Sequence, residues 1–109
     1  MIIVKVTEKN EDIHRIVLSG HADSGPVGYD LVCAGVSAIS FGSVNSVYRL
    51  AKVKLNVEQR AKGGYLDITF PKEITDDQWR KAQLLLKAMI VSLQTIEDQY
   101  SEYIQIKYT

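Results

Sequence analysis

Residues 20–37, GHADSGPVGYDLVCAGVS, connect an expected β-hairpin to an expected helix. This stretch holds Cys33, the only cysteine of the chain, and His21, one of its two histidines. A helix N-terminus and a neighbouring imidazole are two common ways to lower the pKa of a cysteine thiol, whose thiolate is the nucleophilic form. The spacing therefore predicts a nucleophile and its base, brought together by a glycine- and proline-containing loop.

The length and composition predict one globular domain over residues 1–109. Apolar residues make up 46% of the chain and charged residues 24%, and the formal net charge is zero. A balanced charge gives no electrostatic reason to expect a direct nucleic-acid or membrane partner. A single cysteine cannot form an internal disulfide, and we find neither a signal-peptide pattern nor an apolar run of about 18 residues, as a membrane span requires. We therefore expect a cytoplasmic protein.

Alternation of apolar and polar residues predicts five strands, over residues 2–7, 13–19, 53–58, 66–70 and 104–108. The first two strands form a hairpin through a polar turn, and the next two form a second hairpin through the glycine-containing turn at residues 61–64. The expected order is β-β-α-β-β-α-β. This order predicts a two-layer α+β domain, with a mostly antiparallel sheet and both helices on one face.

The two helices differ in character. The first, over Leu31–Leu50, has a stripe of spaced apolar residues among many small ones. Its Gly35 and Gly42 are seven residues apart and predict close approach of another backbone on a shared face, since a glycine inside a helix costs about 1 kcal/mol relative to alanine. The second runs to about Asp98 and begins with a capping box, Thr75 with Gln78 three residues later.

Asp30 carries two interpretations. As N-cap of the first helix, it would place Cys33 at the third helical position, close to unpaired backbone N–H groups. Alternatively its carboxylate would orient the His21 imidazole as the third member of a triad. Ser37 lies one turn beyond Cys33 on the same face, where it hydrogen-bonds near the thiol or simply packs. The backbone N–H groups of Cys33 and Ala34 are candidate oxyanion donors.

Each of these residues also has a structural interpretation. A free cysteine is often a small buried hydrophobe, and a histidine at a strand end can simply hydrogen-bond its loop. Gly25, Pro26 and Gly28 form either a lid that orders around a substrate or a sharp crossing from sheet to helix. His14, in the second strand, is expected on the solvent face without a role. One cysteine and two histidines without ligand spacing predict no metal site and no cofactor.

The two segments Gly20-His21-Ala22 and Gly28-Tyr29-Asp30-Leu31-Val32-Cys33-Ala34-Gly35-Val36-Ser37 resemble the signature of the ribosomal-processing cysteine protease family, Prp. The resemblance covers essentially the whole chain. It implies that His21 and Cys33 form a catalytic dyad. The residue pattern, rather than the resemblance, makes Asp30 and Ser37 candidate supporting residues. The resemblance further implies a bacterial homodimer that removes a short N-terminal extension from the twenty-seventh protein of the large ribosomal subunit.

A second hypothesis is a non-catalytic module that assembles ribosomes or binds peptides. Such a module would use the same groove and loop, but its thiol would be weakly reactive and Cys33→Ser would leave binding unchanged. A purely structural dimer would leave the arrangement of histidine, loop and cysteine without a purpose.

Overall fold

The computed structural model describes residues 1–20, 27–60 and 64–109, with only the backbone of 27–30. Its elements are β1 (Ile2–Lys9), β2 (Asp12–Ser19), α1 (Val27–Ser46), the π-helical turn η1 (Val47–Ala51), β3 (Asn56–Gln59), β4 (Tyr65–Thr69), α2 (Asp76–Gln99) and β5 (Ile104–Tyr108). The predicted order of strands and helices is therefore confirmed.

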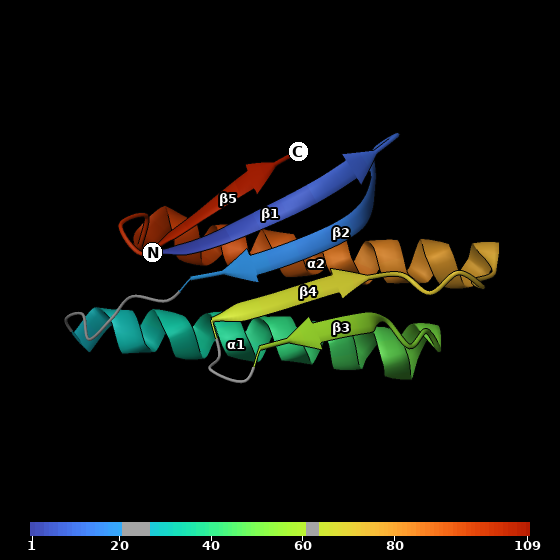
Figure 1. The fold of residues 1–109 in the computed structure, drawn as a ribbon, viewed down its shortest axis with the longest axis horizontal. Coiled ribbons are helices and arrows are strands. Elements are labelled where there is room, and N and C mark those ends of the chain that lie inside the picture. Colours follow the sequence, from blue (N-terminus) through green and yellow to red (C-terminus); the bar gives the residue numbers. More distant parts are fainter. Residues whose placement is uncertain (21–26, 61–63) are drawn as a thin grey trace.

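The five strands form one sheet in the order β3-β4-β2-β1-β5. All neighbours are antiparallel except β1 and β5, which run parallel. Figure 1 shows α1 and α2 side by side on one face of the sheet, with α1 behind β3 and β4 and α2 nearer the centre. The predicted two-layer α+β architecture with a mostly antiparallel sheet is confirmed.

The core lies between the sheet and the two helices. Alternate strand residues such as Val4, Ile16 and Ile68 point toward the helices and are almost fully buried, as are Leu86 and Leu93 of α2. Burying a side chain of this size stabilises the fold by about 1.5–3 kcal/mol. The period-2 strands and the period-3.6 helix therefore present matching apolar surfaces to each other.

The predicted capping box of α2 is confirmed, because Thr75 and Gln78 exchange side-chain to backbone hydrogen bonds of 3.0 and 3.1 Å. Farther along α2, the buried Gln83 accepts from the backbone N–H of Ile13 at 2.7 Å and donates to its carbonyl at 2.6 Å. The pairing of β2 with β4 reaches only Arg15, so this amide replaces a missing strand partner beyond it.

The first helix differs from its prediction at both ends. It begins at Val27, four residues before Leu31, and it ends in η1, where the following Lys52 has a left-handed φ of 59°. Leu50, expected in the buried stripe, lies on η1 with 65% of its surface exposed. The extra π-helical turn rotates this end of the helix, so the regular 3.6-residue spacing no longer holds there.

Strand β3 is shorter than predicted, because it starts at Asn56 rather than at residue 53. Val53 and Leu55 are nevertheless buried in the core. Their alternation with polar residues therefore reflects burial in the connection from η1 to β3. It does not reflect strand pairing, because within the described parts of the chain these residues have no hydrogen-bonded strand beside them.

The glycines of α1 only partly match the expected close approach. A Cβ on Gly35 would lie 3.3 Å from the Ile96 side chain of α2, so α2 does pack tightly there, through a side chain rather than its backbone. A Cβ on Gly42 would meet nothing within 4 Å. The prediction of a shared packing face is therefore wrong for Gly42.

Among the described residues, one helical stretch, Leu31–Ala51, is long and apolar enough to cross a membrane by length and composition, with a mean hydropathy of 1.4. The prediction that the chain contains no such run is wrong by this measure. The alanines and valines of this stretch keep its mean hydropathy high although serines interrupt it. A core helix meets the same criterion, and only 22% of the window is buried in the fold. Much of this apolar helix surface therefore faces outward.

Candidate active site

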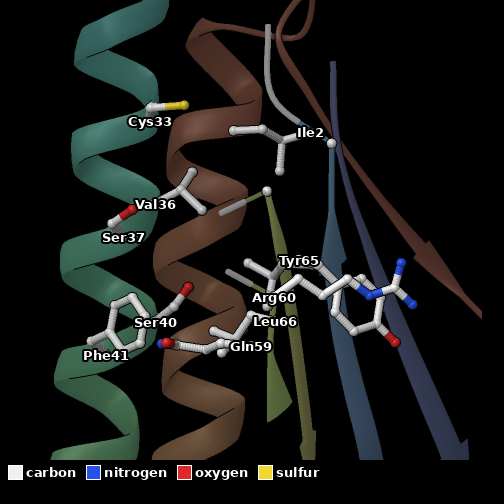
Figure 2. Close-up of a pocket in the computed structure, with 13 residues that line it drawn as sticks. Ile2, Cys33, Val36, Ser37, Ser40, Phe41, Gln59, Arg60, Tyr65 and Leu66 are labelled. Carbon is white, nitrogen blue, oxygen red and sulfur yellow. The ribbon is translucent and has the colours of Figure 1, made fainter. Parts of the chain in front are cut away.

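A cleft of about 330 Å³ lies between α1 and the end of the sheet where β2 finishes and β4 begins. The helix contributes one face to it, which comprises Cys33, Val36, Ser37, Ser40 and Phe41. The sheet and the hairpin of β3 and β4 contribute the rest, namely Ile2, Leu18, Gly20, Gln59, Arg60, Gly64, Tyr65 and Leu66. Figure 2 shows Ile2, Leu66 and Gln59 across the space from the helix residues, whereas the Tyr65 ring and the Arg60 guanidinium lie together on the side of the strands away from α1.

Cys33 is the nucleophile candidate within this cleft. It is a free, half-buried cysteine, and its sulfur points from α1 toward the sheet end that carries Ile2 (Figure 2). Because α1 begins at Val27, Cys33 is its seventh residue and sits in the second turn. The predicted placement of Cys33 at the third helical position is therefore wrong.

Two further predictions change with the start of the helix. Asp30 is the fourth residue of α1, so it is not the N-cap. The backbone N–H groups of Cys33 and Ala34 lie where an α-helix bonds each N–H to the carbonyl four residues earlier. They are therefore not the unpaired donors that an oxyanion site at a helix N-terminus would use.

The structure places the other predicted site residues unevenly. Ser37 lines the cleft together with Cys33, one turn along α1. Gly28 belongs to the first turn of α1 instead of the loop, which shortens the predicted lid. His21, Gly25 and Pro26 lie outside the described residues. His14 is exposed, as expected, with its ring centroid 5.2 Å from that of Trp79.

Gly20 fixes the backbone conformation directly after the end of β2, next to the cleft. Its φ is +87°, and an added Cβ would collide with the backbone carbonyl oxygen of Met1. Its N–H donates to the carbonyl of Gly64 at 2.8 Å, which extends the contact between β2 and β4. Only glycine satisfies both the left-handed conformation and the absence of space. His21 follows Gly20 directly in the sequence.

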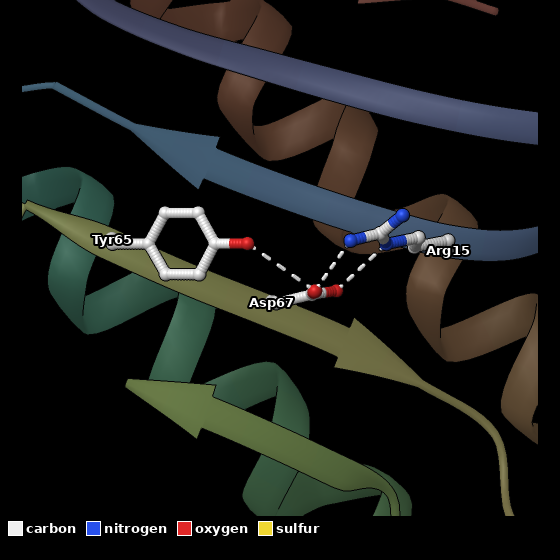
Figure 3. Close-up of polar contacts among 3 residues, drawn as sticks. All are labelled: Arg15, Tyr65 and Asp67. Carbon is white, nitrogen blue, oxygen red and sulfur yellow. Dashed lines mark hydrogen bonds and ion pairs between the residues drawn. The ribbon is translucent and has the colours of Figure 1, made fainter. Parts of the chain in front are cut away.

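A polar network braces the hairpin that forms one wall of the cleft. Arg15 of β2 holds Asp67 of β4 through two hydrogen bonds, of 2.9 and 2.6 Å, and the Tyr65 hydroxyl lies 3.4 Å from the same carboxylate (Figure 3). The guanidinium of Arg60 stacks over the Tyr65 ring, 4.2 Å from its centroid. This network links the outer face of the sheet to two residues of the cleft, Arg60 and Tyr65.

The network also sets the charge of its acid. The Arg15 guanidinium lowers the pKa of Asp67 through hydrogen bonding, against the opposing effect of burial. In turn, the hydrogen bond to the Asp67 carboxylate raises the pKa of Arg15. The carboxylate and the guanidinium therefore stay ionised throughout the neutral range.

Sequence reasoning assigned no role to several of the residues that shape the cleft, including Ser40, Phe41, Gln59 and Arg60. The signal available for the helical ones was the spacing 33, 37, 40 and 41, which puts them on one face of α1. No comparable local signal marks Gln59 or Arg60, because they reach the cleft only through the pairing of β3 with β4.

Solved structures with this fold carry a peptide. A crystal structure of the essential ribosomal processing protease Prp from S. aureus, in complex with a substrate peptide, matches with a TM-score of 0.87 at 39% identity. A second, with a covalently linked product peptide, matches with a TM-score of 0.85 at 40% identity. Each alignment covers all of both chains. Together with the free cysteine in the cleft, these likenesses define the class of this protein as a cysteine protease.

Comparison of sequences gives the particular family. The family model described as cysteine protease Prp matches residues 1–105. The ribosomal processing cysteine protease Prp of Staphylococcus aureus strain Mu50 is 40% identical over 99% of both chains. The protein of that name in Bacillus subtilis strain 168 is 43% identical over 82% of this chain and 80% of its own. The chain belongs to the Prp family of cysteine proteases.

The conformation of Gly20 generates the first testable prediction. We expect Gly20→Ala to lower the free energy of unfolding by more than about 1 kcal/mol, because alanine tolerates neither the positive φ nor the contact with Met1. We further expect kcat/KM to fall about 100-fold, since small displacements at a reacting group are costly. Chemical denaturation and peptide-cleavage assays measure the two effects.

The matched control for this prediction is Gly42→Ala, in a helix position where the added Cβ meets open space. It should stabilise the protein by about 1 kcal/mol, as expected for alanine replacing glycine in a helix. Wild-type activity in the Gly20→Ala variant would show that this backbone position does not control the site.

The second prediction concerns the stability of the hairpin wall as a function of pH. Because the pKa of Asp67 is lowered below its ordinary value of 3.8, its stabilisation is present above that value and is lost as the pH falls through the lowered pKa. We expect Asp67→Asn to lower the free energy of unfolding at pH 7 by about 1–2 kcal/mol. The difference from wild type should shrink below pH 4 in urea titrations at several pH values.

Asp77→Asn provides a control for Asp67→Asn. Asp77 also has a lowered pKa, caused by Lys81, but both partners are largely exposed. Its replacement should therefore have a much smaller effect than Asp67→Asn. Equal effects of the two variants, or a loss in Asp67→Asn that does not depend on pH, would contradict the assigned role of the Arg15–Asp67 pair.

Proposed function

We propose that this protein removes a short N-terminal extension from a bacterial large-subunit ribosomal protein, the twenty-seventh, with His21 and Cys33 as its catalytic dyad. The observation that carries the proposal is the half-buried thiol of Cys33 in a cleft next to the strand end that leads to His21. The S. aureus and B. subtilis relatives, both ribosomal processing proteases by name, support the substrate class.

The position of Gly20 supports the pairing of His21 with Cys33. Gly20 and Cys33 line the same cleft, and consecutive Cα atoms are about 3.8 Å apart. The described chain therefore reaches the border of the cleft at Gly20, one residue before His21 in the sequence. Because Cys33 sits in the second turn of α1, away from the terminal N–H groups, we assign its activation chiefly to the imidazole.

The proposed reaction uses the thiolate as nucleophile. His21 takes the proton of the Cys33 thiol, and the thiolate attacks the scissile carbonyl of an extended peptide in the cleft. The imidazolium then donates its proton to the leaving amine, and a thioester remains on Cys33. A water molecule, deprotonated by His21, hydrolyses the thioester and releases the acid product with the free thiol. Asp30 orients the imidazole and Ser37 hydrogen-bonds near the sulfur.

We also propose that the segment with Gly25 and Pro26, together with Gly28 in the first turn of α1, clamps the substrate, and that the enzyme works in the cytoplasm as a homodimer. The solvent side of α1 and η1 supports the homodimer. It carries large apolar side chains, including Leu31 and Phe41 of α1 and Tyr48 of η1, in a helix stretch of which only 22% is buried in the fold. Apolar patches of this kind on soluble proteins commonly mark interaction surfaces.

A non-catalytic module for ribosome assembly or peptide binding is the alternative. It would require the same cleft, but cleavage would be absent and the thiol dispensable. The membership of the chain in a cysteine protease family favours the enzyme.

The catalytic dyad is tested with a peptide that spans the extended N-terminus of the ribosomal protein and with mass spectrometry. Wild type should make one cut. Cys33→Ala and His21→Ala should fold normally and lose at least about 10⁴-fold in kcat, because the residues of such a unit act together. Cys33→Ser should also lose cleavage, since a hydroxyl is far harder to ionise than a thiol.

His14→Ala is the matched histidine control. His14 lies on β2 outside the cleft, where it is exposed and its ring is next to that of Trp79. It should retain the activity of wild type. Persisting cleavage by Cys33→Ala or His21→Ala would refute the dyad, whereas binding without cutting by wild type would favour the assembly module.

The homodimer is tested by sedimentation at micromolar concentration. Wild type should have the mass of two chains, and Tyr48→Glu should shift the equilibrium toward the monomer, because it places a charge on the apolar solvent side of α1 and η1. A wild-type protein that sediments as a monomer at all concentrations would contradict the proposal.

A further inference from the structure

The cleft extends well beyond the nucleophile. Ser40 lies seven residues after Cys33 on α1, and at 1.5 Å per residue this is a distance of about 10 Å along the helix axis. An extended peptide covers this distance with about three residues. The far end of the cleft therefore lies within reach of substrate side chains up to about three positions from the scissile bond.

Ser40 has a buried hydroxyl without a partner. The residue is only 1% exposed, and within the described parts of the chain its Oγ has no hydrogen bond. Two other serines of the same helix are satisfied, because Ser43 donates to the Ile39 carbonyl at 2.6 Å and Ser46 donates to the Gly42 carbonyl at 2.8 Å. Figure 2 shows the Ser40 hydroxyl directed away from the helix into the space between α1 and the sheet.

Among the described residues, the surroundings of this hydroxyl are mostly apolar and uncharged. Val36 and Leu66 are buried in the walls beside it, and the uncharged Gln59 side chain extends from β3 toward α1 in Figure 2. Among the described residues that line the cleft, Arg60 is the only charged one, and its guanidinium is stacked on Tyr65. A charged ligand group would therefore lose water without gaining a counter-ion at Ser40.

A buried hydroxyl without a partner is unfavourable for the free protein. Such groups persist where function requires them, commonly at binding sites, where stability is given up for recognition. The combination found here, apolar walls with a few polar groups that fix orientation, is typical of ligand-binding pockets.

We propose that Ser40, with Gln59, reads one substrate side chain within about three residues of the scissile bond, and that this side chain has an apolar stem and an uncharged hydrogen-bonding end. The matching chemistry is a carboxamide, an aliphatic hydroxyl or a phenol. Ser40 is thus a specificity-determining residue of the protease. The inference rests on the proposed function for its substrate, the N-terminal extension of the ribosomal protein.

The test compares wild type, Ser40→Ala and the control Ser43→Ala on a set of peptides. The parent peptide spans the ribosomal-protein extension, and in each variant peptide one position within four residues of the cut carries an amide or hydroxyl side chain or its apolar counterpart of similar size. For wild type, one position should show a loss of about tenfold in kcat/KM when the polar end is removed. Ser40→Ala should lose this preference, and Ser43→Ala should keep it.

Stability supplies a second readout. Ser40→Ala removes the buried hydroxyl without a partner, so its Tm should equal or exceed that of wild type, and a changed preference would then not reflect unfolding. A preference profile identical in wild type and Ser40→Ala would overturn the pocket alone. Failure of wild type to cut the parent peptide would refute the proposed function and the pocket with it.

Discussion

The pairing of β2 with both β1 and β4 is the interaction on which the site depends. β2 is the middle strand of the sheet, and its register places the start of β1, the end of β2 and the start of β4 at the same edge. Met1, Gly20 and Gly64 meet there, and the hydrogen bond from Gly20 to Gly64 prolongs the ladder by one step. A slip of one residue would turn the inward side chains of β2 outward and would move this edge away from α1.

The position of Cys33, the proposed nucleophile, on α1 has a consequence for the proposed mechanism. A cysteine in the first turn of a helix is activated by unpaired backbone N–H groups, but those groups lie a turn away from Cys33. In return, the second turn gives the thiol a rigid backbone whose hydrogen bonds are already made within the helix. The proposed mechanism accordingly assigns proton transfer to His21, which directly follows Gly20, the last described residue after β2.

The cleft combines a rigid wall with a polar group, the Ser40 hydroxyl, that makes no hydrogen bond to the described residues. The Arg15–Asp67 pair and Tyr65 brace the hairpin from the outer face, while Ser40 faces the cleft from within the helix layer. The first arrangement contributes to stability, and the second leaves a buried hydroxyl without a hydrogen-bond partner among the described residues. Both would serve the proposed peptide recognition, because a fixed wall and a polar group in an apolar pocket discriminate among side chains better than a soft surface does.

The sequence by itself determined the elements and their order. Period-2 and period-3.6 patterns depend only on neighbours along the chain, so the strands, the capping box of Thr75 with Gln78 and the exposure of His14 followed from it. The start of α1 at Val27 had a local signal too, since Pro26 precedes it and proline favours the first turn of a helix, but Asp30 offered a competing cap. The motif with Cys33 also placed the chain in its family.

Only the tertiary structure decided what surrounds the thiol. Arg15 and Asp67 are 52 residues apart, and Gly20 meets Met1 and Gly64 only once three strands are in register. The open space beside Gly42 and the hydroxyl of Ser40 without a partner likewise depend on where a neighbouring layer lies. The physical reason is that periodicity specifies which face of an element is buried, whereas contacts between distant residues depend on how the buried faces pack against each other.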